Sequence, residues 1–431
     1  MSSVLFSEKI METFMKNADD IELMTADEKN QLQLERLQST INRAFRNVPF
    51  HRKRFSEAGV DPAKIQSIRD IARLPFMKRE HLSQHYPYDL FAVPLRDIVR
   101  IHTAPGTTRN PTVSGYTPQD LNIWQQILAR GLRAANVTPH DILQITLTPG
   151  LANWGRDYKR GAELIEASVI PNIPLSIEKK VMLLRDYKTS VLVTPPALAM
   201  ELAVYIKEQD INVNSLELAT LILAGDLISP ANRRFLEETL HVSVWLHYGL
   251  SEVPGPAIAF ECPIHDGLHV NEDHFLAEIV DPETGAPMPE GKPGELVLTT
   301  LTTRAFPLIR FRTGDKAEFY KAPCSCGRSW KRIGWYAERT DDILNIDGVN
   351  VHGQLVHANL QKTIGNIPPS VRFFVQQAEG KKYLEVWLPV STEIFSDEIK
   401  ELEKLIRHAE NKLRENLGVP VYIRLKEKMD R

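Results

Sequence analysis

The segment Val242-Ser-Val-Trp-Leu-His-Tyr-Gly-Leu-Ser-Glu252 runs from an apolar stretch into a short polar motif. Residues 242–246 predict a buried strand, and a carboxylate just beyond the end of a parallel strand is well placed to hold a divalent cation near a ligand. The same motif also fits the start of a helix, with Ser251 as the cap and Glu252 in the first turn. Both interpretations stay open at this point.

Three further apolar runs precede this segment, at residues 141–147, 190–194 and 220–224, and helical stretches such as 121–135 separate them. Short apolar strands that alternate with helices are typical of a parallel sheet covered by helices. The sequence therefore predicts an α/β fold.

The two ends of the chain have other patterns. Residues 1–100 read as helices with polar connectors. Further along, the turns Pro-Glu-Thr-Gly and Glu-Gly-Lys-Pro-Gly precede a strand at 295–299, and this pattern predicts antiparallel structure. The tail reads as strand, strand, helix and strand, at 371–376, 383–388, 396–416 and 421–425. We expect a large N-terminal domain, 1–339, whose antiparallel part covers about 255–335, and a small C-terminal α+β lid, 340–431.

Composition excludes several classes of protein. The 431 residues carry a net charge of −3, with 43% hydrophobic and 25% charged residues, which is typical of a globular protein. No apolar run approaches the roughly 18 residues of a membrane helix, and the N-terminus lacks the pattern of a signal peptide. These two absences lead us to expect a cytoplasmic protein without a membrane partner. Because the chain also has no block of Lys and Arg, we expect no nucleic-acid partner.

Two other polar motifs are candidates for a nucleotide site. In Thr103-Ala-Pro-Gly-Thr-Thr-Arg-Asn-Pro-Thr112, a glycine beside two threonines can present N–H groups and hydroxyls to phosphate oxygens, although an ordinary turn has the same composition. In Phe311-Arg-Thr-Gly-Asp315, the carboxylate after a strand is suited to ribose hydroxyls, whereas a type II turn is the alternative.

All three cysteines of the chain lie in one region. We expect Cys324 and Cys326 to supply one pair of ligands for zinc. Cys262 and a following histidine would supply the other pair, with His269 preferred and His265 the alternative. Four protein ligands leave no open position, so this zinc would be structural. The other interpretation is three reduced, buried thiols.

Together, the motifs resemble the adenylate-forming superfamily, and specifically its phenylacetate-CoA ligase family. The resemblance extends along nearly the whole chain, and its order and spacing are specific. The segments that carry it are 47–61, 90–102, Tyr-Gly-Leu-Ser-Glu at 248–252, 267–275, Arg-Phe-Arg-Thr-Gly-Asp at 310–315, and 338–351.

The resemblance implies a two-step reaction. A carboxylate attacks the α-phosphate of ATP to give an acyl adenylate and pyrophosphate, and the thiol of coenzyme A then displaces AMP. It also implies Mg²⁺, different lid orientations for the two steps, and a homodimer. The acid, and whether the acceptor thiol is coenzyme A or that of a carrier protein, stay open.

The resemblance further assigns roles to individual residues. The expected catalytic residues are Thr107, Glu252, which would bind Mg²⁺, and Arg339. The expected nucleotide-binding residues are Gly106, Thr107, Thr108, Arg79, Ala224, Gly225, Asp226, Tyr248, Gly249 and Asp315. The lid is expected to turn at Asp341, with Asp342 as the alternative pivot.

The family's acyl-pocket segments correspond to residues around Trp154 and to Pro196 and Ala197. An aryl or arylacetic acid is expected there, with Ala197 enlarging one side of the pocket and Trp154 filling another. Trp154 is equally compatible with a place in the hydrophobic core.

The chain departs from the family in several places. Its phosphate motif lacks both serines, one glycine and the lysine of the family's loop, although Arg109 returns a positive charge, and Ala224-Gly-Asp-Leu227 replaces Gly-Ala-Glu-Pro. The family's terminal lysine segment has no counterpart, and Lys426 and Lys428 are expected to be poor substitutes. Loss of one such charge slows chemistry by about 10² to 10³, so we expect weakened adenylation. The alternative is a non-catalytic member that binds a nucleotide or acyl-CoA and acts through a partner.

Overall fold

The computed structural model describes residues 19–104, 111–147, 152–171, 173–253, 255–347, 349–365, 367, 371–378, 381–389 and 399–426. The described residues form two compact units, with the boundary between Thr340 and Asp341. Each unit is considered by itself below.

An eleven-stranded sheet forms the centre of the first unit, with its strands in the order β10-β11-β12-β13-β9-β8-β7-β6-β5-β3-β4. Strands of the parallel part are β3 (Ile142–Ile145), β4 (Ser168–Ile170), β5 (Val191–Thr194), β6 (Thr220–Ala224) and β7 (Ser243–Tyr248). Strands of the antiparallel part are β8 (Ala259–Glu261), β9 (Leu268–Val270), β10 (Phe275–Val280), β11 (Gly294–Thr300), β12 (Phe311–Phe319) and β13 (Arg332–Arg339).

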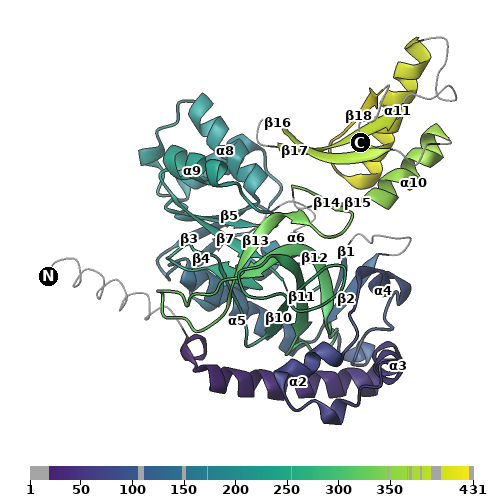
Figure 1. Ribbon diagram of the computed structural model, residues 1–431. Helices are drawn as coiled ribbons and strands as arrows, with labels where there is room; N and C mark the ends of the chain where they lie inside the picture. The colour runs from purple at the N-terminus through teal and green to yellow at the C-terminus, as the bar shows by residue number, and fades with distance from the viewer. Residues whose placement is uncertain are drawn as a thin grey trace. The chain divides into compact units, whose positions relative to one another are not determined.

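Apolar composition explains the parallel part. Every residue of β5 is buried, as expected for a strand covered on both faces, and β3 to β7 pair only in parallel with one another. Helix α5 (Pro118–Ala134) precedes β3. The helices between the strands are α6 (Ala152–Leu164), α7 (Ile177–Asp186), α8 (Pro196–Glu208) and α9 (Pro230–Leu240), and in Figure 1 α8 and α9 lie above β5 and β7. This arrangement confirms the predicted α/β fold.

Antiparallel pairing begins where β7 meets β8 and continues to the edge strand β10. The strand expected at 295–299 is β11. Strand β12 contains an irregularity between Asp315 and Ala317, and Gly314 just before it has φ +76°. A glycine tolerates this backbone conformation, which allows the strand to bulge and redirects the side chain of Asp315.

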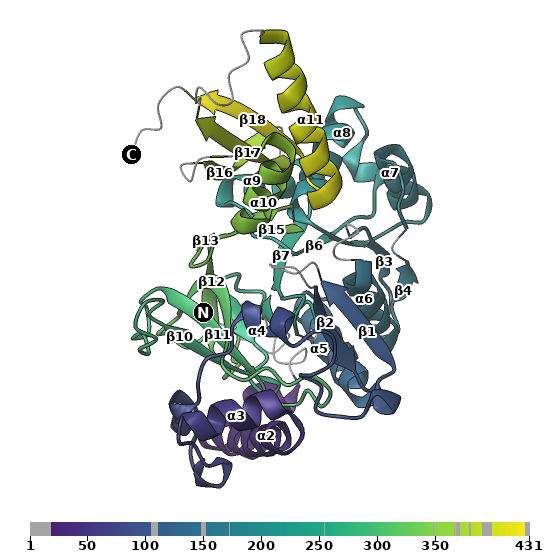
Figure 2. The ribbon, with the colours of Figure 1, turned by 90° about the vertical axis from the view of Figure 1, so that its right-hand side faces the viewer.

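The N-terminal helices lie against the antiparallel part. They are α2 (Ala26–Asn47), α3 (Pro49–Glu57) and α4 (Arg79–Gln84), and a hairpin of β1 (Arg100–Ala104) and β2 (Thr112–Tyr116) follows them. Helix α2 is fixed by hydrogen bonds from Gln33 to the carbonyl of Glu272 and from Thr40 to that of Leu301, both 2.8 Å long. Figure 1 and Figure 2 both show α2 and α3 side by side near β10 and β11.

The second unit has its own hydrophobic core. Its elements are β14 (Ile343–Ile346), β15 (Val349–His352), α10 (Gly353–Ile364), β16 (Arg372–Ala378), β17 (Lys381–Pro389), α11 (Ile399–Leu417) and β18 (Val421–Lys426). The final four match the expected order of strand, strand, helix and strand. The β14–β15 hairpin and α10 were not predicted, although Asp347-Gly348 between two apolar stretches is a recognised hairpin signal.

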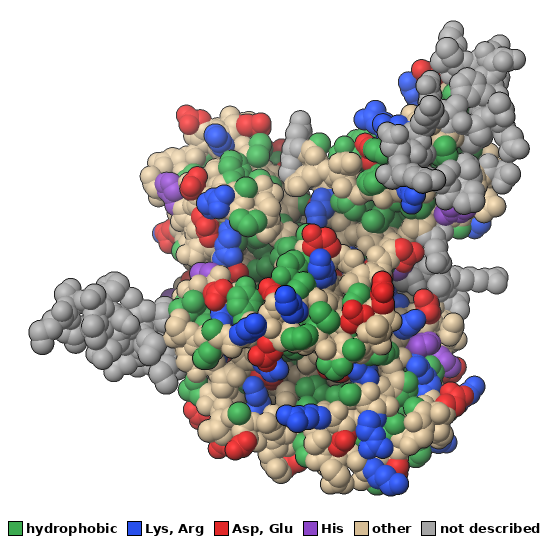
Figure 3. All heavy atoms as spheres, in the orientation of Figure 1, with side chains coloured by type: hydrophobic (Ala, Val, Ile, Leu, Met, Phe, Trp, Pro, Cys, Tyr) green, Lys and Arg blue, Asp and Glu red, His purple; other side chains and the backbone are tan. Residues whose placement is uncertain are grey.

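The surface carries charges of both signs (Figure 3), as expected for a chain with a net charge of −3. On the face drawn in Figure 3, basic and acidic side chains are interspersed across the described residues. None of the helices in the described part of the chain has both the length and the apolar character needed to cross a membrane.

Candidate functional site

The carboxyl ends of β6 and β7 define the candidate site. These neighbouring parallel strands place Ala224 beside His247, so the residues that follow both strands emerge at the same edge of the sheet. The chain leaves β6 through Gly225, whose φ is +98°. Asp226 is buried and accepts a 2.8 Å hydrogen bond from the backbone N–H of Leu227.

A direct hydrogen bond joins β7 to β12. The phenol of Tyr248 donates to Oδ2 of Asp315 at 2.6 Å, although the two residues are far apart in the sequence. Burial and the adjacent carboxylate raise the pKa of Tyr248 well above its ordinary value, so this phenol stays protonated and remains the donor. Two residues expected to bind nucleotide are thus brought into contact.

Arg339 completes this group from the end of β13. Its Nη1 pairs with Oδ1 of Asp315, and its Nη2 donates to the carbonyl oxygen of Thr313 at 2.8 Å. The sheet register places Asp315 and Arg339 opposite one another. The carboxylate of Asp315 is therefore held from one side by a phenol and from the other by a guanidinium.

Glu252 lies in a loop beyond β7. Its carboxylate is buried and forms an ion pair with Arg79, whose Nη2 donates to the carbonyl of Thr313 at 3.0 Å. Gly249 is required before it, because a Cβ at that position would lie 2.6 Å from the carbonyl oxygen of Gly255. Since residues 251–253 form a bend, the helix-cap interpretation of Ser251 and Glu252 is wrong.

The other alternative, a type II turn at Gly314 and Asp315, is also wrong. Both residues lie within β12, at the bulge that changes the direction of the Asp315 side chain. The short motif resembled a turn because a glycine with positive φ occurs in both structures.

Three residues of the expected phosphate loop, Gly106, Thr107 and Thr108, lie outside the described residues, as does Arg109. Their flanks are described: Ala104 at the end of β1 pairs with Thr112 at the start of β2. The structure therefore leaves the phosphate-binding assignment as a prediction.

The expected acyl-pocket residues lie at the starts of two helices. Trp154 is in α6 and is buried among the residues of the main hydrophobic core. Pro196 is the first residue of α8 and is buried, and Ala197 beside it is half-buried. The burial of Trp154 fits both a core residue and the wall of a pocket.

The expected pivot lies at the boundary between the two units. Asp341 is the first residue of the second unit, and its Oδ1 accepts a 3.3 Å hydrogen bond from the N–H of Ile343. The carbonyl of Asp342 accepts a 3.3 Å hydrogen bond from Gly353. Both aspartates are exposed.

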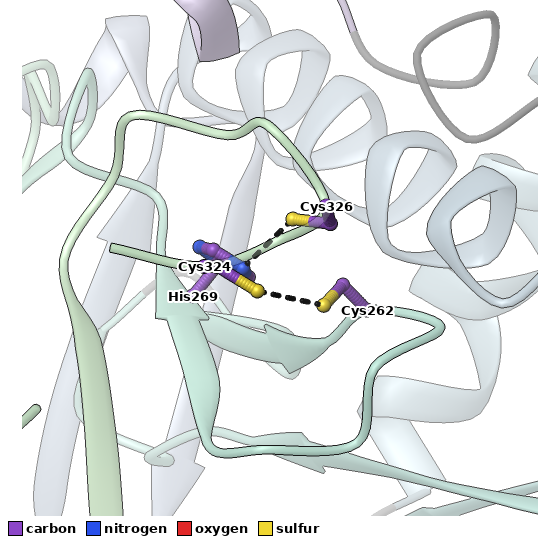
Figure 4. A group of neighbouring side chains, drawn as sticks. All are labelled: Cys262, His269, Cys324 and Cys326. Atoms are coloured by element: carbon purple, nitrogen blue, oxygen red, sulfur yellow. Dashed lines mark hydrogen bonds between the residues drawn. The ribbon is translucent and has the colours of Figure 1, made fainter. Parts of the chain in front are cut away.

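The three cysteines converge with one histidine beside strands β8 and β9. Cys262 follows β8, His269 lies on β9, and Cys324 and Cys326 lie between β12 and β13 (Figure 4). All four are buried, and their ligand atoms lie within 4.8 Å of one another. The sulfurs of Cys262 and Cys324 are 3.6 Å apart, and Sγ of Cys326 is 3.4 Å from Nε2 of His269.

These distances fit a tetrahedral zinc site. With Zn–S bonds of about 2.3 Å, the edge between two sulfurs of a tetrahedron is about 3.8 Å. The other ring nitrogen of His269, Nδ1, lies 3.2 Å from the carbonyl of Trp330, which directs Nε2 towards the sulfurs. His265 lies elsewhere, with its Nδ1 3.1 Å from the carboxylate of Glu261. The geometry therefore groups His269 with the cysteines.

Known proteins resemble this chain over most of its length. No family model matches the chain. A phenylacetate-coenzyme A ligase of Thermus thermophilus is 37% identical over 419 residues, which cover 94% of each chain. The chain belongs to the phenylacetate-CoA ligase family. A second phenylacetate-CoA ligase, from Pseudomonas putida, is 39% identical over 334 residues, covering 77% of this chain and 75% of that protein.

Solved structures support the family's fold. A 2-hydroxyisobutyryl-CoA ligase in complex with 2-HIB-AMP and CoA has a TM-score of 0.86 and 25% sequence identity, and the match covers 95% of this chain and 89% of that one. The amide bond synthetase McbA from Marinactinospora thermotolerans has a TM-score of 0.58 at 16% identity, over 78% of this chain and 67% of that chain, which shows a shared fold alone.

In this member of the phenylacetate-CoA ligase family, the sequence did not predict that two backbone carbonyls would contact site residues. The carbonyl of Thr313 accepts from both Arg79 and Arg339, and the carbonyl of Trp330 orients His269. Thr313 belongs to a motif singled out from the sequence. Its side chain gave no indication of the role, because the contact is made by the main chain.

Proposed function

We propose that this member of the phenylacetate-CoA ligase family joins a carboxylic acid to coenzyme A through an acyl adenylate, with ATP as the activating substrate. The observation that carries the proposal is the arrangement at the strand ends, where Asp315, Tyr248, Arg339, Glu252 and Arg79 form one connected group. Such a site acts by positioning its substrates and by stabilising phosphoryl charge.

The carboxylates have separate roles in this proposal. Asp315 accepts the ribose hydroxyls, since Tyr248 and Arg339 fix its orientation. Glu252 would hold Mg²⁺, which would neutralise charge on the phosphates. Gly106 and the hydroxyls of Thr107 and Thr108 contact the β- and γ-phosphates, and the segment from Ala224 to Asp226 faces the adenine.

The acid is proposed to be an aryl or arylacetic acid. Its ring would lie between the start of α6, near Trp154, and the start of α8, near Pro196 and Ala197. The family relatives named above are phenylacetate-CoA ligases, which favours phenylacetate as the first acid to test.

The altered phosphate loop leads to a kinetic proposal. With the family's serines and lysine absent from residues 103–112, we propose that acyl-adenylate formation is slower than thioester formation. Lys426 is a poor replacement, since its Nζ lies 4.5 Å from the centre of the Trp387 ring and packs on that face. The lid turns at Asp341 between the two steps.

The Cys/His cluster is proposed to bind a structural zinc ion. Cys262, His269, Cys324 and Cys326 supply three thiolates and one imidazole at tetrahedral spacing, and burial keeps water from the ion. The ion would tie β8 and β9 to the turn between β12 and β13, without a part in the chemistry. A cytoplasmic location and a homodimer remain predictions; light scattering of the purified protein tests the second.

A direct assay tests the proposed reaction. Purified protein is incubated with Mg²⁺-ATP and a panel of aryl acids, with and without coenzyme A, and pyrophosphate and thioester are measured. Pyrophosphate release slower than thioester formation from a supplied acyl adenylate supports the full proposal. Pyrophosphate release as fast as that of an intact family member would refute the weakened step.

The altered loop also favours a second candidate, a non-catalytic member that binds ATP, AMP or an acyl-CoA. Calorimetry separates the two functions when it is combined with the assay above. Binding of AMP or acyl-CoA without turnover supports the second candidate. Binding of none of the three ligands would contradict both.

A further inference from the structure

The ion pair between Arg79 and Glu252 occupies the carboxylate proposed to hold Mg²⁺. Nη1 of Arg79 contacts Oε1 of Glu252, and both side chains are nearly inaccessible, with 11% and 5% of their surfaces exposed. A buried pair of this kind is screened little by solvent. The guanidinium of Arg79 therefore places a positive charge directly against the carboxylate of Glu252.

The backbone register explains why Arg79 is placed there. The N–H of Met77 donates to the carbonyl of Arg310 at 2.9 Å, and the N–H of Arg312 donates to the carbonyl of Met77 at 2.8 Å. Met77 thus forms a parallel bridge with Phe311. Two residues further along both segments, Arg79 reaches the carbonyl of Thr313, while its guanidinium carbon lies 5.7 Å from the centre of the Phe311 ring.

A guanidinium and a magnesium ion compete for the same oxygen. Mg²⁺ binds a carboxylate oxygen at about 2.0 to 2.1 Å and requires near-octahedral geometry around it. Nη1 of Arg79 already contacts Oε1 of Glu252, and the positive charge of the guanidinium repels a second cation. The metal therefore has to displace Arg79 from the carboxylate before Glu252 becomes a ligand.

We infer that Arg79 and Mg²⁺ exchange on Glu252 when Mg²⁺-ATP binds. The inference rests on the proposed function, in which Glu252 is the metal ligand. Without nucleotide, Arg79 neutralises Glu252 and excludes the free cation. With Mg²⁺-ATP, the metal takes the carboxylate and the released guanidinium pairs with phosphate oxygens. Arg79 is thus a positioning residue that restricts metal binding to the nucleotide complex.

The exchange predicts effects of opposite sign in one variant. Arg79→Gln removes the competing charge, so the nucleotide-free variant should bind Mn²⁺, used in place of Mg²⁺, at least tenfold more tightly than the parent. It should also bind Mn²⁺-ATP about tenfold more weakly, because the phosphate contact is lost. A residue with only a structural role would not improve one affinity while it weakens the other.

Mn²⁺ titration of the full chain, followed by electron paramagnetic resonance, tests this exchange. Lys78→Gln is the matched control, since it removes an exposed positive charge next to Arg79 and should leave both affinities unchanged. The double variant Arg79→Gln/Glu252→Gln should lose the gained Mn²⁺ site. Equal nucleotide-free Mn²⁺ affinity in Arg79→Gln and the parent would overturn the exchange.

The single variant Glu252→Gln separates the two proposals. If it weakens Mn²⁺-ATP binding but Arg79→Gln gains no affinity for the free metal, Glu252 is a ligand and only the exchange is wrong. If Glu252→Gln leaves Mn²⁺-ATP binding unchanged, the metal-ligand role of Glu252 fails, and the exchange fails with it.

Discussion

Tyr248 at the end of β7 donates its phenolic hydrogen to the carboxylate of Asp315 on β12, over 2.6 Å and inside a buried environment. This bond joins the parallel and antiparallel parts of the sheet at the candidate site. It also fixes one of the two oxygens of Asp315, while Arg339 pairs with the other. The orientation of Asp315, the residue proposed to bind the ribose, therefore depends on β7 and β13 as well as on its own strand, β12.

Tyr248→Phe should raise the KM for ATP about tenfold. A hydrogen bond to a charged group contributes about 1.5 to 3 kcal/mol, and about 1.4 kcal/mol corresponds to a factor of ten. Steady-state kinetics with varied ATP measures the change. Tyr336→Phe is the matched control, because Tyr336 donates a 2.8 Å hydrogen bond to Glu318 on the same sheet. An equal KM change in both variants would contradict a specific role for Tyr248.

Zinc content distinguishes the two histidines near the cysteines. The parent should contain one zinc ion per chain, and His269→Gln should lose it, because the site then lacks its fourth ligand. His265→Gln should retain the ion, since His265 contacts Glu261 instead. Elemental analysis of protein purified without chelator gives the result. Well under one zinc ion per chain in the parent would refute the proposed site.

The buried ion pair between Arg328 and Glu22 should be important for stability. Nε of Arg328 donates to Oε1 of Glu22 at 2.6 Å, and the two side chains are 1% and 0% exposed. Arg328→Met would leave a buried carboxylate without this partner, which costs about 3 to 5 kcal/mol. Denaturant unfolding should show this loss. Arg328→Met/Glu22→Gln should recover a large part of it.

An exposed ion pair provides the comparison for this prediction. Lys53 and Glu57 are 3.8 Å apart, with 76% and 62% of their side chains exposed. Lys53→Met should change the free energy of unfolding by less than about 1 kcal/mol. A similar loss in both single variants would show that burial is not the deciding factor.

His247 should make stability fall in mild acid. Burial lowers its pKa from 6.5 to about 4, and its Nδ1 lies 2.8 Å from the hydroxyl of the buried Tyr158. The folded state therefore binds a proton less readily than the unfolded state. Its contribution to stability is fully present above pH 6.5 and is lost as the pH falls from 6.5 to 4, by up to about 3 kcal/mol.

His247→Asn should reduce the slope of unfolding free energy against pH in this interval, while His140→Asn, at an exposed position, should not. Nuclear magnetic resonance of the imidazole provides a direct check. A measured pKa for His247 close to 6.5 in the folded protein would contradict the burial argument.

Four of the five parallel strands were predictable because they are short, continuous apolar runs, whereas β4, with three residues, was not predicted. The run at 220–224 coincides with β6, and the helix expected at 121–135 is α5 with a shift of a few residues at its start. The hairpin of β14 and β15 was missed because Asn345 and Asn350 interrupt these two strands, so neither forms a continuous apolar run.

The candidate site was predictable only as separate pieces. The sequence singled out Tyr248, Asp315, Glu252 and Arg79, but their contacts depend on strand register between segments that are distant in the chain. The bulge at Gly314 aims Asp315, and the bridge at Met77 places Arg79. The cysteine cluster was easier to predict, because few residue types bind zinc and the chain has only three cysteines.

Product analysis with phenylacetate, Mg²⁺-ATP and coenzyme A tests the central claim most directly. Chromatography should show AMP and a phenylacetyl thioester formed in equal amounts, and Asp315→Asn should slow both by the same factor. Formation of ADP in place of AMP, or of AMP without any thioester, would contradict the assignment of this chain as an adenylate-forming acid–CoA ligase.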